Sequence, residues 1–248
     1  TYTITKKPAE GRKWIVKTRK STSPKEVKGW SRYLLERGRL ERGEGKPKVA
    51  TKTFIEAYEF CRKHKLHSRA VDAAHMVGIA GTKEQQIEWN LKAIKEAEEG
   101  KMKGWLAVGW NNLGYTYDDL GRYEKSLEAY LKAREYHWET GREKNKLIAD
   151  WAVGKAYRNL GKYKKAASWL RPTLAWSERL KDKEWIGFSC YELGFVHSAQ
   201  GRYRTAKVYL ERAMKLLKEV GMLTWGKWGK KQYSLLEKEH EKVVSKLK

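Results

Sequence analysis

Residues 110–133 read WNNLGYTYDDLGRYEKSLEAYLKA, and the pattern of this stretch recurs twice further along the chain without a gap. Its two glycines, Gly114 and Gly121, return at a period of 40 residues as Gly154 and Gly161 and then as Gly194 and Gly201. Further positions keep the same register: Tyr117, Tyr157 and His197; Tyr123, Tyr163 and Tyr203; Ser126, Ala166 and Ala206; Tyr130, Leu170 and Leu210; Ala133, Thr173 and Ala213. A fixed period of this length indicates a repeat protein, in which each unit packs only on its neighbours.

The spacing within one unit predicts two helices joined by a tight turn. Apolar residues recur three and four positions apart on both sides of the second glycine, as amphipathic helices require. The second glycine, Gly121 in the first copy, is expected to end a helix in the left-handed conformation, which glycine adopts without strain. Small residues such as Gly114 and Ser126 suit the point where the two helices cross. The sequence therefore predicts an all-α chain.

The copy at residues 110–133 resembles the tetratricopeptide repeat nearly position for position. Trp110, Leu113-Gly114 and Tyr117 are followed by a small residue, an aromatic residue and an alanine, which are Ser126, Tyr130 and Ala133. The usual repeat has 34 residues, so the 40-residue period here implies helices about one turn longer. The chain is similar to the long-repeat subclass found in kinesin light chains and spindle-orientation adaptors. The resemblance implies a right-handed α-solenoid of antiparallel helix pairs.

Two weaker copies precede the three strong ones. Ala74, Gly81, Asn90 and Ala93 keep the register of one copy, and Gly38, Gly45, Ala50, Phe54 and Ala57 that of another. About five repeats are therefore expected within residues 28–222, at about 28–65, 66–100, 104–140, 144–181 and 184–220. Residues 1–27 are expected to form a basic arm or a β-hairpin, because runs 2–5 and 14–17 favour strands. Residues 223–248 are expected to form a helix that caps the open end of the solenoid.

The composition is strongly basic, with 54 Lys and Arg against 30 Asp and Glu, which gives a net charge of +24. Such a charge attracts polyanions, although it also suits a merely solvated surface. No apolar run of about 18 residues suggests a membrane span, and the first residues do not resemble a signal peptide. The two cysteines, Cys61 and Cys190, are expected to be buried thiols in a reducing, cytoplasmic setting.

The family resemblance implies a binding groove on the concave face, which is lined by the first helix of each repeat. By register, the groove residues are Asp72, His75, Asn111, Asn112, Tyr115, Asp119, Trp151, Lys155, Arg158, Asn159, Tyr191, Glu192, Phe195 and Ser198. Rings and amides of this kind can anchor a bound peptide. An alternative for Trp151 and Tyr191 is that both rings pack between neighbouring repeats. The carboxylate clamp of some family members is not reproduced, because its paired basic positions are Ile148 and Ala152 here.

Catalytic and metal-binding motifs are not recognisable in the sequence. There is no P-loop, no G-x-S-x-G elbow and no H-E-x-x-H, and Asp118 and Asp119 are adjacent on a helix, where neighbours do not face each other. Cys61, His64 and His67 are three residues apart, but they diverge around a helix and lack a fourth ligand for structural zinc. The sequence thus predicts no enzyme, no cofactor and no metal site.

These observations lead to a protein-interaction scaffold that binds an acidic or amphipathic segment of a partner in the concave groove. The second hypothesis is an RNA- or DNA-binding repeat protein that acts through its basic surface. The candidate polyanion contacts of the N-terminal arm are Lys6, Lys7, Arg12, Lys13, Lys17, Arg19 and Lys20. A third hypothesis, motivated by the density of lysine at exposed positions, is an engineered repeat scaffold without an evolved ligand.

Overall fold

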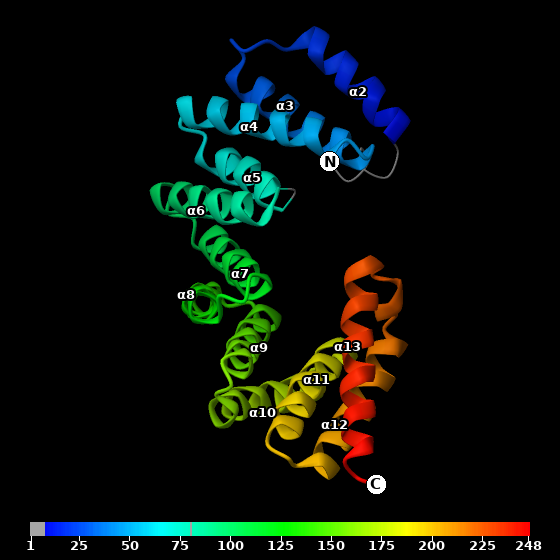
Figure 1. The fold of residues 1–248 in the computed structure, drawn as a ribbon. Coiled ribbons are helices and arrows are strands. Elements are labelled where there is room, and N and C mark those ends of the chain that lie inside the picture. Colours follow the sequence, from blue (N-terminus) through cyan, green and yellow to red (C-terminus); the bar gives the residue numbers. More distant parts are fainter. Residues whose placement is uncertain (1–7, 80) are drawn as a thin grey trace. The chain divides into compact units, whose positions relative to one another are not determined.

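The computed structural model describes residues 8–79 and 81–248, and in this part of the chain it contains twelve α-helices and no strand (Figure 1). The helices form two compact units, which divide between Gly121 and Arg122. Within each unit every helix contacts the next one along the chain. This arrangement confirms the predicted all-α array of helix pairs, and it adds a division into two units that the repeat pattern did not predict.

The first unit holds six described helices. Their bounds are α2 Pro8–Ser21, α3 Val27–Gly43, α4 Pro47–Lys63, α5 His67–Gly78, α6 Lys83–Glu99 and α7 Lys103–Asp119. Helix α5 is the shortest of them, and the turn after it contains the Gly81 of the weak second copy. The step from Gly45 to Gly81 is 36 residues instead of 40, and the short first helix of this repeat accounts for the difference.

The second unit holds six α-helices and one short 3₁₀ segment. Their bounds are α8 Tyr123–Thr140, α9 Glu143–Asn159, α10 Tyr163–Arg179, α11 Lys183–Ala199, α12 Tyr203–Glu219, η1 Met222–Thr224 and α13 Gly226–Ser245. Besides contacting its neighbour in sequence, α11 also contacts α9 and α13. First helices of successive repeats therefore pack side by side, and α13 continues that row.

Left-handed residues end the helices at regular intervals, as the glycine pattern predicts. Gly121, Gly161 and Gly201 have φ of +68°, +70° and +73°. The turns between repeats use the same conformation, with Gly141 at φ of +80° in one turn and Lys65, Lys101 and Lys181 at +53°, +52° and +55° in the others. A non-glycine residue in this region is strained by its Cβ, so the inter-repeat turns that carry a lysine at this position are the less favourable ones.

Glycines inside the first helices allow close helix crossings. A Cβ on Gly154 would lie 2.7 Å from Cγ of Leu170, and one on Gly194 would lie 2.5 Å from Cδ2 of Leu210. Both leucines are fully buried, so neither can move aside. The prediction of small residues at the crossing is confirmed in these two repeats.

The prediction of an N-terminal arm or hairpin is wrong for residues 8–21. These residues form helix α2, which packs on α3. Gly11 and Ile15, four residues apart, are buried on one face of the helix. Arg19 lies 4.8 Å from the ring centre of Trp30. Tertiary packing thus outweighs the strand preference of Ile15 and Val16. The other strand-like run, residues 2–5, lies outside the described residues.

The C-terminal helix α13 covers the last repeat, as predicted. Leu236 and Val243 are fully buried, and the Tyr233 hydroxyl donates to the carbonyl oxygen of Met214 at 3.3 Å. Both cysteines are also buried and unpaired. Among the described residues, no helix is long and apolar enough to cross a membrane.

Candidate binding surfaces

In the first unit, most predicted groove residues bridge helices of successive repeats. Arg39 on α3 pairs with Asp72 on α5 at 2.5 Å, and Lys83 on α6 pairs with Asp119 on α7. Nδ1 of His75 lies 3.1 Å from Nδ2 of Asn112, and burial lowers the His75 pKa, which favours the neutral ring in this contact. These polar side chains therefore hold repeats together. Of the remaining two, Asn111 is half-buried and Tyr115 is exposed.

In the second unit, the prediction of an open groove is wrong for three residues of α11. Tyr191, Glu192 and Ser198 are all buried. The Tyr191 hydroxyl donates to Gln232 Oε1 at 3.5 Å, and the Ser198 hydroxyl donates to Glu239, so α13 occupies this face. The alternative for Tyr191, packing within the array, is confirmed.

The remaining groove residues of this unit lie at the junction of α9 and α11. Arg158 pairs with Glu192 and lies 5.4 Å from the ring centre of Phe195. Lys155 and Asn159 are half-buried on α9. Trp151 packs on rings of α11, which confirms its alternative placement as well.

Five rings from α9, α11, the residue after η1 and α13 form one continuous cluster, which we call the aromatic platform. Its members are Trp151, Trp185, Phe188, Trp225 and Trp228. Each ring centre lies between 5.3 and 6.4 Å from the next. Neither indole Nε1 of Trp151 nor that of Trp185 has a hydrogen-bond partner, so packing rather than hydrogen bonding holds these two side chains. Trp228 is 41% exposed and opens the platform to solvent.

Lysines border the aromatic platform on α9 and at the start of α13. The Lys155 ammonium lies 5.8 Å from the Trp151 ring centre, and Lys227, Lys230 and Lys231 are exposed in the first turns of α13. No Asp or Glu occurs between Glu219 and Glu237, but Asp150 directly precedes Trp151, and Glu184 directly precedes Trp185. The α13 side of the platform, around Trp228, is therefore cationic.

A second aromatic site lies between α8, α9 and α10. A cavity of about 680 Å³ is lined by Trp138, Gly141, Glu143, Lys146, Pro172, Ala175, Trp176 and Arg179. The two indoles donate to Asp150 at 3.0 Å and to Glu143 at 2.9 Å. One repeat further on, the corresponding cavity of about 540 Å³ has Glu178 and Leu216 in place of Trp138 and Trp176. The repeat geometry creates the hollow, and local sequence makes one copy aromatic.

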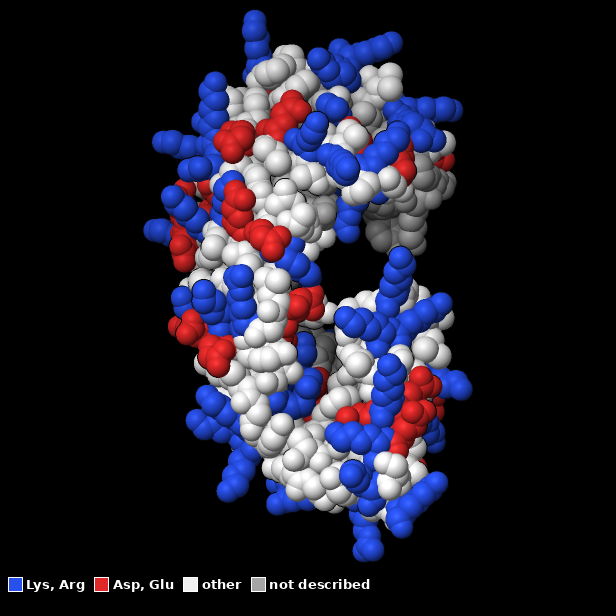
Figure 2. Space-filling model, viewed as in Figure 1, with Lys and Arg blue, Asp and Glu red and all other residues white. Residues whose placement is uncertain are grey.

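The positive charge is distributed over both units rather than gathered in one site. The first unit has 25 Lys and Arg against 15 Asp and Glu, and the second has 29 against 15. Figure 2 shows basic side chains spread over the visible face, with small acidic groups between them. Net charge therefore does not locate a binding site by itself.

The predicted polyanion contacts at the N-terminus divide into two groups. Arg12 pairs with Glu44 at 2.6 Å, and Arg19 stacks on Trp30, so both hold α2 in place. Lys13, Lys17 and Lys20 are exposed on α2. Lys6 and Lys7 lie outside the described residues.

Comparison with known proteins identifies the repeat. Two family models, both described as tetratricopeptide repeat, match residues 107–137 and 145–219. These two segments are tetratricopeptide repeats. Among curated proteins, none gives a significant match.

Solved structures show the same tetratricopeptide fold at low sequence identity. A Podosopora anserina putative kinesin light chain with TPR-like repeats is 16% identical over 80% of this chain and 98% of its own, with a TM-score of 0.62. BtubC (BKLC) from P. vanneervenii is 18% identical over 86% and 90%, with a TM-score of 0.71. The Rap conjugation gene regulator of plasmid pLS20, in complex with the Phr* peptide, is 14% identical over 90% and 66%, with a TM-score of 0.52.

Sequence register did not predict four members of the aromatic platform. Only Trp151 was among the predicted groove residues, because Trp185 and Phe188 lie outside the family positions. Trp225 and Trp228 belong to the capping segment. The available signal was the number of tryptophans, 12 in 248 residues, and the dense run Trp225-Gly226-Lys227-Trp228.

Proposed function

We propose that this tetratricopeptide protein is a non-enzymatic scaffold that binds an acidic segment of a partner protein on the aromatic platform. The observation that carries the proposal is the platform itself, with Trp228 open to solvent and lysines around it. Large indole rings supply contact area at low entropic cost, and they dominate many interfaces. Lysines at the rim favour an acidic partner and speed its approach.

The chemistry of the partner segment follows from this arrangement. Apolar side chains would rest on Trp228 and the neighbouring rings, while carboxylates would meet Lys227, Lys230 and Lys231. An amphipathic segment with acidic residues combines both features. The Rap conjugation gene regulator, whose fold is similar to that of this chain, forms a complex with the Phr* peptide. That similarity supports a peptide ligand but not its position.

A separate contact is proposed within the first unit. Asn111 and Tyr115 lie on α7, and Asn112 faces α5 through its contact with His75. An amide can hydrogen-bond a peptide backbone, and an exposed ring can anchor a side chain.

We place the protein in a reducing compartment such as the cytoplasm, because both buried cysteines are unpaired.

A designed peptide tests the proposal by fluorescence anisotropy. A labelled peptide that alternates Leu and Glu is compared with the same peptide carrying Lys for Glu. The Glu peptide is expected to bind, and Trp228→Ala should weaken that binding by about tenfold, which corresponds to the loss of one anchoring ring. Unchanged binding in Trp228→Ala would show that the peptide is held elsewhere by net charge alone.

A matched pair of charge variants separates the platform from the general positive surface. Lys230→Glu with Lys231→Glu changes charge next to the platform, whereas Lys246→Glu with Lys248→Glu makes an equal change at the far end of the chain. The first pair should weaken peptide binding much more than the second. Equal effects would contradict a local site.

The nucleic-acid hypothesis is tested in the same assay with a labelled single-stranded RNA. Trp228 and the nearby lysines would also suit base stacking and phosphate contact. RNA binding that falls steeply between 50 and 200 mM salt, as counterion release requires, together with no binding of the Glu peptide, would favour that function instead.

A further inference from the structure

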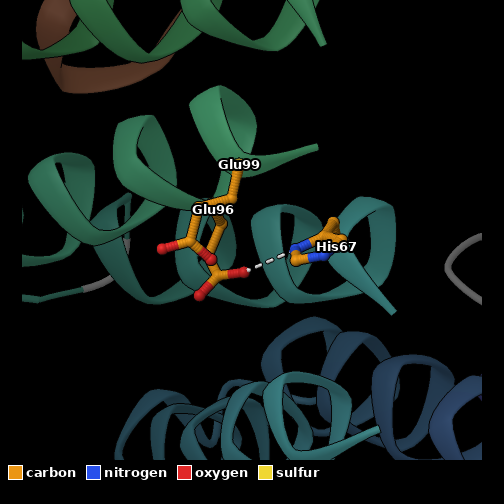
Figure 3. Close-up of side chains that lie close together, drawn as sticks. All are labelled: His67, Glu96 and Glu99. Carbon is orange, nitrogen blue, oxygen red and sulfur yellow. Dashed lines mark hydrogen bonds and ion pairs between the residues drawn. The ribbon is translucent and has the colours of Figure 1, made fainter. Parts of the chain in front are cut away.

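Three side chains of types that can ligate a metal lie together in the first unit, on α5 and α6. Donor atoms of His67, Glu96 and Glu99 all lie within 4.8 Å of one another. Nδ1 of His67 is 3.1 Å from Oε2 of Glu96. Figure 3 shows His67 reaching from the start of α5 toward the two carboxylates, which come from the last turn of α6.

The burial of Glu96 is consistent with a ligand role. Its side chain is only 1% exposed, so its charge is costly unless compensated. Its other oxygen, Oε1, lies 2.7 Å from Nε of Arg62 on α4. An ion-binding carboxylate commonly has its second oxygen held by an outer partner in this way. Arg62 thus orients Glu96 and leaves Oε2 directed toward His67.

The helix terminus adds an independent reason for a cation here. The last turn of α6 contains Glu96, Glu98 and Glu99 and no basic residue. A helix C-terminus carries partial negative charge, so carboxylates are unfavourable there and cations are favourable. Two neighbouring carboxylates, three positions apart on one face, also repel each other. A divalent cation between them would relieve both effects.

The donor set selects the class of ion. One imidazole nitrogen with two carboxylate oxygens suits zinc and similar divalent transition metals, whereas calcium and magnesium prefer oxygen alone. Ligand bonds of about 2.0–2.1 Å in tetrahedral geometry place donor atoms about 3.4 Å apart. The His67–Glu96 separation of 3.1 Å, which is a hydrogen bond without metal, is close to that value, so an ion would replace the shared proton. Glu99 is exposed, so it can close on the ion and leave a route for entry.

We propose that His67, Glu96 and Glu99 bind a divalent transition-metal ion that links α5 to α6, with a fourth coordination position open to solvent. This repeat is one of the two weak copies and has the shortened first helix. A metal clamp would therefore stabilise a repeat whose sequence matches the family pattern poorly.

Zinc titration of the chelator-treated full chain tests this site by calorimetry. Glu99→Gln, which changes an exposed side chain, should weaken zinc binding at least tenfold, and His67→Ala should do the same. Glu98→Gln is the matched control, because it removes an equal charge from the same turn outside the cluster. His64→Ala controls for a nearby histidine that is not in the cluster.

Two further readouts make the result decisive. Cobalt bound at the site should give a visible absorption band that is present in Glu98→Gln and lost in Glu99→Gln. Zinc should raise the melting temperature of the wild type and of Glu98→Gln but not of Glu99→Gln, while all three melt alike without metal. Zinc affinity that is absent in the wild type, or equal in Glu98→Gln and Glu99→Gln, would overturn the proposal.

Discussion

The guanidinium of Arg158 on α9 pairs with the carboxylate of Glu192 on α11, a side chain that is only 2% exposed. The pair links two first helices of successive repeats. A buried carboxylate that loses its partner retains an uncompensated charge. The ion pair therefore matters less for its own attraction than for the cost of breaking it.

Arg158→Ala is expected to lower the free energy of unfolding by about 2–4 kcal/mol, because it leaves Glu192 buried and unpaired. Adding Glu192→Gln should recover part of that loss by removing the charge. Urea denaturation of the three proteins measures the effect. Arg179→Ala is the control, since its pair with Glu143 is 70% and 55% exposed and should contribute below about 1 kcal/mol. Equal losses in the two alanine variants would contradict this reading.

Gly194→Ala tests the close crossing of α11 and α12. The added methyl group would meet fully buried Leu210 at 2.5 Å, and such overpacking costs about 1–3 kcal/mol. Gly104→Ala on α7 is the matched control, because nothing lies within 4 Å of its Cβ position. There the better helix propensity of alanine should leave stability unchanged or raise it by up to about 1 kcal/mol. Thermal melts that do not separate the two variants would argue against the crossing.

Lys181→Gly tests the strain of the inter-repeat turn. Lys181 has a left-handed backbone with φ of +55°, which costs a non-glycine residue about 1–2 kcal/mol, partly offset by the greater unfolded-state entropy of glycine. We expect a gain of about 0.5–1 kcal/mol in unfolding free energy. The opposite change, Gly161→Ala at φ of +70°, should lose about 1 kcal/mol. A loss of stability in Lys181→Gly would show that the lysine side chain outweighs the strain.

The repeat register predicted the fold because a few residues determine it locally. Gly121, Gly161 and Gly201 end helices for steric reasons that act within the turn itself. Helix α2 was missed for the opposite reason. The strand preference of Ile15 and Val16 is visible in the sequence, but the contact of α2 with α3 is not.

The candidate sites were harder to predict because they combine elements distant in sequence. Tyr191 and Ser198 occupy groove positions by register, yet α13 covers them, and no repeat motif describes that helix. Likewise, His67 was compared with ligands on the preceding helix, whereas its neighbours Glu96 and Glu99 lie on α6. Register assigns a residue to a helix face, but only packing shows what lies opposite.

The pH dependence of stability should report the buried histidines. Burial lowers the pKa of His197, and nearby Arg171 and Arg202 lower it further. The unfolded state, with a histidine pKa near 6.5, then binds more protons than the folded state in mildly acidic solution. His197 therefore contributes stability that is fully present above about pH 6.5 and is lost as the pH falls toward the lowered folded pKa. Burial also lowers the pKa of His75 and His137, which act in the same direction.

Urea midpoints measured at pH 7.5 and pH 5.5 check this expectation. The wild type should be less stable at pH 5.5, and His197→Gln should show a smaller difference between the two pH values, because glutamine does not titrate. The His197 ring stacks on Tyr209 at 5.4 Å, so the substitution will also lower stability at both pH values. The quantity to compare is thus the change in urea midpoint between pH 7.5 and pH 5.5, and not the absolute stability. Parallel pH profiles for the two proteins would show that His197 titrates alike in the folded and unfolded states.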